Sequence, residues 1–171
     1  SDPSVLYKLT WSSIARIEFY EQLLLQEAAR LIAAKNLREA YEYLSFLHKN
    51  YADLPGLSAV TETYLRQDAL ASYREKKYEE TLTILLSLYD VNPQHRGMKK
   101  FVETVTDRLI SQHLADRDFA AARSVLDTLS SSFPELPLAN VSSWRDKFQL
   151  GASRQLQTAR QAVEQKQYLE A

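Results

Sequence analysis

Residues 78–93 read YEETLTILLSLYDVNP, and this stretch decides the fold class. Thr81, Leu85 and Leu88 follow Tyr78 at offsets of three, seven and ten, so they share one face of a helix. Pro93 ends that helix, because proline lacks a backbone N–H and its ring clashes with the preceding turn. The stretch therefore predicts a helix that opens on an aromatic residue and stops before a proline.

The same pattern recurs once before this stretch and once after it, at an equal step. Leu37 and Phe119 stand in the place of Tyr78, and a small residue follows each of them three positions on. Repetition at a fixed step of about 41 residues is typical of stacked helical units. In the order of the three copies, the matching positions are Leu37, Tyr78 and Phe119; Ala40, Thr81 and Ala122; Leu44, Leu85 and Leu126; and Leu47, Leu88 and Leu129.

A second apolar stripe precedes each of these helices at the same step, and its spacing is again helical. Two polar residues separate the two stripes in every copy, which predicts a tight turn and hence an antiparallel helical hairpin. The stripe positions are Phe19, Val60 and Phe101; Leu23, Tyr64 and Val105; Ala28, Ala69 and Ile110; and Ile32, Tyr73 and Leu114. The polar turns are Lys35-Asn36, Lys76-Lys77 and Arg117-Asp118.

The pattern predicts a single helical-repeat domain over residues 1–171. Its hairpins are expected at about 13–52, 57–92, 98–133 and 141–171. The last hairpin opens with an apolar series from Val141 to Val163, which predicts one helix of more than twenty residues despite Gly151.

Both ends of the chain carry further expectations. Lys166-Gln167, Tyr168 and Ala171 reproduce a turn and the start of a second helix, so we expect a truncated fourth hairpin and a fragment of a longer protein. We expect the first helix to run from Trp11 to Ala34. Residues 5–9 either cap the stack or belong to an upstream region.

The second copy resembles a tetratricopeptide repeat. Ala69, Tyr78, Thr81 and Pro93 match the family's small residue, opening aromatic, second small residue and closing proline. The step of about 41 residues exceeds the family's usual length of about 34 and lies in the range of HEAT and armadillo arrays. The resemblance implies an all-α fold, a right-handed α-α superhelix or solenoid of stacked antiparallel hairpins.

The resemblance also implies a concave groove lined mainly by first helices, in which a peptide segment would bind. Arginines, an aspartate and amides there would grip a peptide's backbone or carboxylate, whereas the simpler alternative is a solvated helix face. The residues that the resemblance places inward are Gln26, Arg66, Leu70, Arg74, Asp107 and Ser111.

Composition excludes several classes of partner. The 21 basic and 22 acidic residues are interspersed, so no strong field favours nucleic acid or anionic lipid. No stretch reaches the roughly 18 apolar residues of a membrane span, and we expect a soluble chain. The absence of cysteine excludes disulfides and thiolate metal sites but leaves the compartment open, either cytoplasmic or secreted and periplasmic.

No catalytic, cofactor-binding or metal site is predicted. The three histidines fall in different registers, and His113 with Asp116 supplies too few ligands for zinc. No nucleotide-binding loop, Gly-x-Ser-x-Gly or His-Glu-x-x-His motif is present. Among the tyrosines, periodicity predicts a core position for Tyr64, Tyr73 and Tyr78, while Tyr41, Tyr43 and Tyr89 stay open between core and binding surface.

These observations favour a noncatalytic scaffold that binds a peptide segment or a neighbouring domain through its superhelical surface. The alternative is an accessory helical-repeat region of a larger enzyme, transporter component or receptor whose activity lies outside this chain. An apolar ligand cavity between the long helices is a third possibility. The partner's identity does not follow from the sequence.

Overall fold

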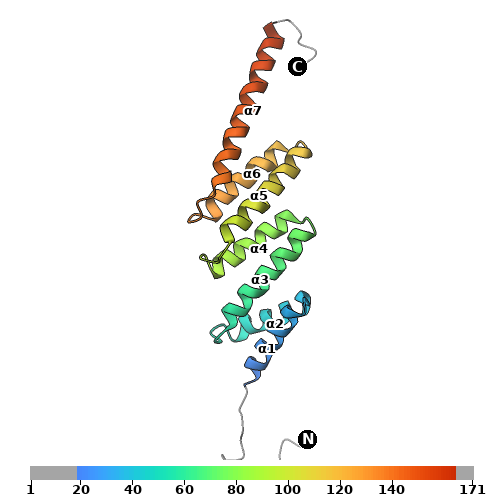
Figure 1. The fold of residues 1–171 in the computed structure, drawn as a ribbon, viewed down its shortest axis with the longest axis vertical. Coiled ribbons are helices and arrows are strands. Elements are labelled where there is room, and N and C mark those ends of the chain that lie inside the picture. Colours follow the sequence, from blue (N-terminus) through green and yellow to red (C-terminus); the bar gives the residue numbers. More distant parts are fainter. Residues whose placement is uncertain (1–18, 165–171) are drawn as a thin grey trace, which may run out of the picture. The chain divides into compact units, whose positions relative to one another are not determined.

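The computed structural model describes residues 19–164, and this range is all-helical with no strand (Figure 1). The all-α prediction is therefore confirmed. None of the described helices is long and apolar enough to cross a membrane. The helices are α1 (Tyr20–Ala33), α2 (Leu37–Asn50), α3 (Leu57–Arg74), α4 (Tyr78–Val91), α5 (Met98–Ala115), α6 (Phe119–Ser132) and α7 (Ala139–Glu164).

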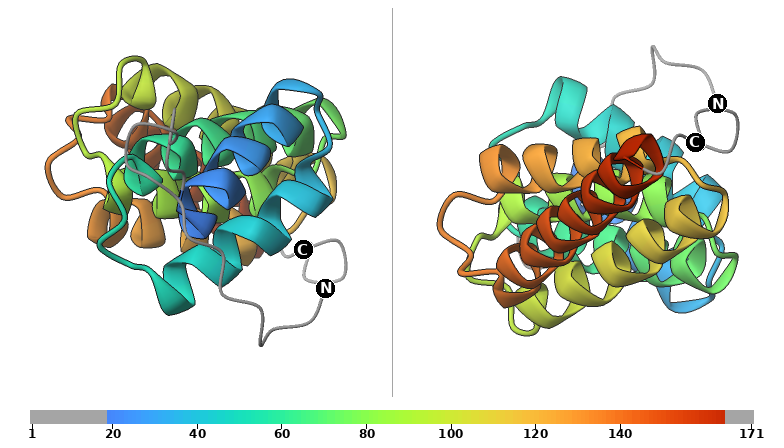
Figure 2. Two further views of the ribbon diagram at one scale, coloured as in Figure 1. Left: turned by 90° about the horizontal axis from the view of Figure 1, so that it is seen from below. Right: turned by 90° about the horizontal axis from the view of Figure 1, so that it is seen from above.

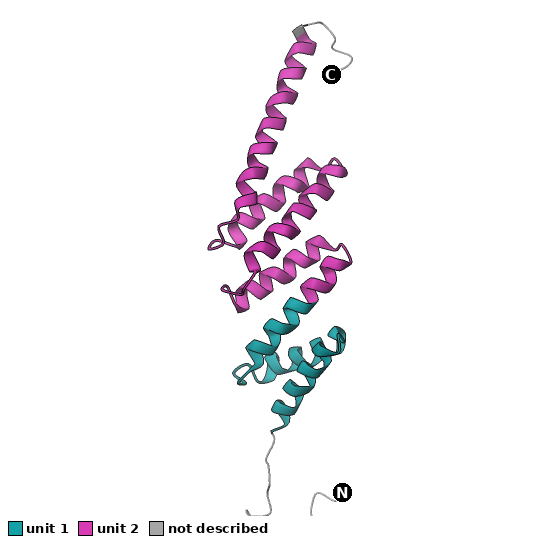
Figure 3. Ribbon diagram, viewed as in Figure 1, with its two compact units in different colours: residues 1–67 teal, residues 68–171 magenta. Residues whose placement is uncertain are grey.

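The chain divides into two compact units, residues 1–67 and residues 68–171, and the boundary falls within α3 (Figure 3). Helix bounds recur at the step seen in the sequence. Helices α2, α4 and α6 each have 14 residues and begin at Leu37, Tyr78 and Phe119, while α3 and α5 each have 18.

One hydrogen-bonding pattern closes three of the interhelical turns. After α1, the N–H of Asn36 donates to the carbonyl of Leu31 and the N–H of Lys35 donates to that of Ile32, at 2.9 and 3.0 Å. This is the Schellman motif, in which one residue takes a left-handed conformation that glycine usually fills. The turns after α3 and α5 have the same bonds, and the left-handed residues are Lys35, Lys76 and Arg117, with φ of 62°, 62° and 59°.

The first unit has its core between α1, α2 and the start of α3. Ala28 and Ala40 are fully buried, so small side chains let α1 and α2 approach closely. His48 Nε2 lies 2.8 Å from Thr61 Oγ1, and the Thr61 hydroxyl itself donates to the carbonyl of Leu57. His48 therefore donates through Nε2, which joins the end of α2 to α3.

The second unit has its core between α4, α5 and α6. The predicted stripes are buried there at Leu85, Leu88, Ala122, Leu126 and Leu129, among others. Buried threonines satisfy their hydroxyls within their own helix, because Thr81 donates to the carbonyl of Lys77 and Thr106 to that of Val102. Tyr89, which the sequence left open, is a core residue that packs edge-on against Phe133.

Several core predictions are wrong at the margins of the packed helices. Helix α1 begins at Tyr20 because the backbone of Phe19 is extended, so the helix predicted from Trp11 to Ala34 is not continuous at Phe19. Its predicted part at residues 11–18 lies outside the described residues. Phe19 and Leu23, which the stripe predicted to be buried, are exposed. Phe119 is also exposed, at 51%. The expectations for residues 5–9 and 166–171 lie outside the described residues.

Candidate partner-binding groove

The first turns of α7 are attached to α5 by hydrogen bonds. Glu103 Oε1 accepts from the N–H of Ala139 at 2.9 Å, which places a carboxylate at the positive end of the helix dipole. Asp107 Oδ1 accepts from Trp144 Nε1 at 2.7 Å and from Asn140 Nδ2 at 3.1 Å. Together with the buried Val141, these contacts fix the start of α7 on the hairpin before it.

The second half of α7 has a different environment. Figure 1 shows that it extends beyond the end of α6, and the view from above in Figure 2 shows α7 running diagonally across α5 and α6. Residues 149–161 are all exposed. The apolar series nevertheless continues through this half at helical spacing, with Ala152, Leu156, Ala159 and Val163 following Phe148.

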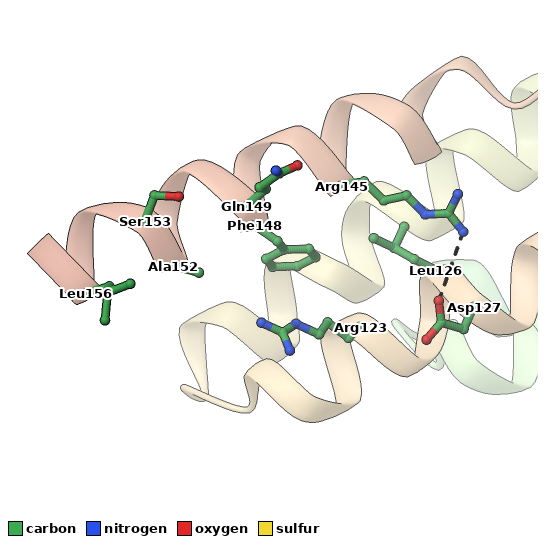
Figure 4. Close-up of a pocket in the computed structure, with 9 residues that line it drawn as sticks. All are labelled: Arg123, Leu126, Asp127, Arg145, Phe148, Gln149, Ala152, Ser153 and Leu156. Atoms are coloured by element: carbon green, nitrogen blue, oxygen red, sulfur yellow. Dashed lines mark ion pairs between the residues drawn. The ribbon is translucent and has the colours of Figure 1, made fainter.

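An open groove of about 470 Å³ lies between α6 and α7 (Figure 4). Phe148, Ala152 and Leu156 point from α7 toward the side on which Arg123 of α6 lies. Leu126 is a buried core residue that also lines the groove. The remaining lining residues are polar and come from both helices: Arg123, Asp127, Arg145, Gln149 and Ser153.

A second groove of about 320 Å³ adjoins the first and shares three of its residues, Arg123, Phe148 and Ala152. Phe119 and Leu114 line this second groove together with Trp144 and Gly151. The exposure of Phe119 is thus part of a larger apolar surface under α7. We call the two grooves together the α7 groove.

Basic side chains border the α7 groove. Arg123 is exposed and has no ion pair among the described residues. Arg145 donates to Ser130 Oγ at 2.9 Å and lies 4.0 Å from Asp127 Oδ1. Lys147 Nζ lies 4.2 Å above the centre of the Trp144 ring, a cation–π contact.

The structure places the six groove residues that the resemblance suggested on three helices. Gln26 of α1 and Arg66 of α3 are exposed in the first unit. In the second unit Leu70 is half-buried, Arg74 is exposed, and the Ser111 hydroxyl donates to the carbonyl of Asp107 at 2.6 Å. Asp107 has a role that the sequence did not reveal, because its carboxylate accepts hydrogen bonds from α7.

The described residues hold no cluster of metal-binding side chains. No group of three or more His, Asp and Glu side chains that could hold a metal ion is found in that part of the chain. His113 Nε2 lies 3.6 Å from Glu79 Oε1, a contact between α5 and α4, and His48 is engaged with Thr61. These histidines join neighbouring helices.

Comparison of the chain with known protein families, with curated proteins and with solved structures finds no match. The α7 groove was not predicted. Its apolar α7 residues, Phe148, Ala152 and Leu156, belong to the apolar series from Val141 to Val163. That series predicted a long helix, but helical spacing does not tell which part of an apolar face is covered.

Proposed function

We propose that this protein is a noncatalytic interaction scaffold whose α7 groove docks an amphipathic helix of a partner. One observation carries the proposal: the second half of α7 presents an apolar stripe that the described residues leave exposed. Leu156 is 53% exposed and Val163 is 51% exposed. Contiguous apolar surface of this kind marks interaction sites in folded proteins.

A helix is the partner element that this surface suits best. The stripe from Phe148 to Val163 spans about 22 Å along α7, which is the length of a four-turn helix. A partner helix lying along it would place its own apolar ridge beside Phe148, Ala152 and Leu156, as helices do in other grooves. The tetratricopeptide resemblance supports this use of stacked hairpins, although it predicted a different surface.

Charge suggests which amphipathic helices would fit. Arg145 and Lys147 of α7 and Arg123 of α6 line the groove, and Asp127 is the only acidic residue among its described lining residues. Acidic residues flanking the apolar face of a partner would meet these cations. Complementary edges of this kind raise the association rate and select among partners.

The proposal is tested by affinity capture. The protein is isolated from cells that express it, and the partner bound to it is measured. Leu156→Asp places a charge in the groove and should reduce capture of the partner at least tenfold. Leu150→Asp is the matched control, because Leu150 is equally exposed, at 54%, on the same helix but lines neither groove. Equal capture by both variants would refute docking in the α7 groove.

The bound segment also distinguishes the two interpretations of the chain. A segment from another protein, identified by cross-linking and mass spectrometry, supports an interaction scaffold. A segment from the same polypeptide supports the accessory region of a larger protein. Both cases require an apolar face with acidic flanks on the segment.

A further inference from the structure

A separate groove of about 430 Å³ lies between α1 and α2 in the first unit. Leu24 and Tyr43 form its floor, since both are half-buried and pack against the core of that unit. Tyr20 and Phe46 stand at its sides and are 61% and 43% exposed. Aromatic and aliphatic surfaces therefore line the groove from both helices.

Two carboxylates complete the lining, those of Glu39 and Glu42. Both are exposed, and no ion pair or hydrogen bond engages either side chain within the described part of the chain. They stand on one face of α2, three residues apart. An apolar surface with two unneutralised acids favours a ligand that is aliphatic along its length and cationic at its end.

Arg30 senses the charge of Glu39, but its guanidinium is already engaged. Arg30 Nε and Nη2 donate to Glu27 at 2.8 and 2.6 Å. The pKa of Arg30 is raised mainly by this hydrogen bond with Glu27, and the charge of Glu39 raises it further. Arg30 thus lies within the field of Glu39 while its guanidinium is bound elsewhere.

We propose that the groove between α1 and α2 binds a lysine or arginine side chain of a partner peptide. The aliphatic stem lies on Leu24 and Tyr43, as such stems do on apolar surfaces. The cation lies close to Glu39 and Glu42 and within reach of the aromatic rings of Tyr20 and Phe46. The inference rests on the proposed function only for the premise that the chain binds protein segments. It does not require the α7 groove, because the groove between α1 and α2 belongs to the first unit.

Other occupants fit the groove less well. An apolar helix would bury Glu39 and Glu42 without partners, which is costly. Two carboxylates lack the further ligands that a divalent cation requires. Anionic ligands such as nucleic acid are repelled by the same two charges.

Short peptides of known sequence provide the test. The probes are acetyl-Ala-Leu-Lys-Leu-Ala-amide, its arginine twin and a twin with norleucine, which keeps the stem and removes the cation. Amide NMR shifts of the full chain at Leu24, Tyr43 and Phe46 report binding. We expect saturable shifts with the two cationic peptides, affinity at least fivefold weaker for the norleucine peptide, and weakening by added salt.

Paired variants locate the cation. Glu39→Gln with Glu42→Gln should weaken binding of the lysine peptide about five- to tenfold. Asp53→Asn is the matched control, since Asp53 is an exposed acid of the same unit outside the groove, and it should leave affinity unchanged. Leu156→Asp should also leave affinity unchanged, so failure of this site and failure of the α7 groove are distinguishable.

Three results would overturn the inference. One is equal affinity for the norleucine and lysine peptides, and another is equal loss in the Asp53→Asn control. The third is concentration-dependent shifts at Leu24, Tyr43 and Phe46 without peptide, which would show that a second copy of the chain occupies the groove.

Discussion

The two halves of α7 carry one apolar pattern in two environments. In the first half, Val141 is buried, Trp144 and Asn140 donate to Asp107, and Glu103 caps the helix start. In the second half the same spacing brings Ala152, Leu156 and Val163 to an exposed face. An amphipathic pattern therefore predicts a face that suits packing, but it does not identify what packs there.

The largest effect is expected from Trp144→Ala. This change removes the hydrogen bond to Asp107, the ring contact with Phe148 and the cation–π contact with Lys147. We expect the free energy of unfolding to fall by about 2–4 kcal/mol. Denaturant unfolding measures it, and hydrogen exchange should accelerate at amides of residues 141–150. A loss below about 0.5 kcal/mol, the size expected of an ordinary surface substitution, would mean that Trp144 does not hold α7 in place.

Asp107→Ala should have the next largest effect. Its carboxylate accepts from both Trp144 and Asn140, and removing it leaves two donors without this acceptor. We expect a loss of about 1.5–3 kcal/mol in unfolding free energy. Asp127→Ala is the control, because Asp127 meets α7 only through an exposed ion pair with Arg145 at 4.0 Å, and such pairs contribute about 0–1 kcal/mol. Equal losses would contradict a special role for Asp107.

The helices were predictable because their signals are local. The stripes predicted the first residue of three helices, Leu37, Tyr78 and Phe119, and the polar pairs predicted the turns before them. The turns themselves were less predictable, because left-handed backbone at Lys35, Lys76 and Arg117 has no glycine to announce it. The exposure of Phe119 was not predicted either, because it depends on how α7 crosses α6 and not on the local spacing of residues.

The site was harder to predict than the fold. Asp107 was expected to face a peptide, yet its carboxylate binds α7, and this depends on Trp144 and Asn140, which lie far along the sequence. The acidic groove between α1 and α2 combines Tyr20 and Leu24 with Glu39 and Glu42. None of these residues, taken alone, marks a site in the sequence, so only their proximity makes one.

Gly151→Ala should strengthen the second half of α7. Gly151 is exposed within the helix, and a Cβ built on it meets nothing within 4 Å. Alanine restricts the unfolded backbone and favours the helix, which is worth about 0.5–1 kcal/mol. Hydrogen exchange should slow at amides of residues 152–160 while those of α5 are unaffected. Faster exchange in this half would show that the helix requires glycine at this position.

The smallest effect is expected from Leu156→Ala. A buried leucine loses about 2–5 kcal/mol on truncation, but an exposed one leaves no cavity. With Leu156 about half exposed, we expect the free energy of unfolding to change by less than about 0.5 kcal/mol. Capture of a partner should nevertheless weaken, because the side chain lines the α7 groove. A loss above about 1 kcal/mol that depends on protein concentration would show instead that a second copy of the chain covers this half of α7.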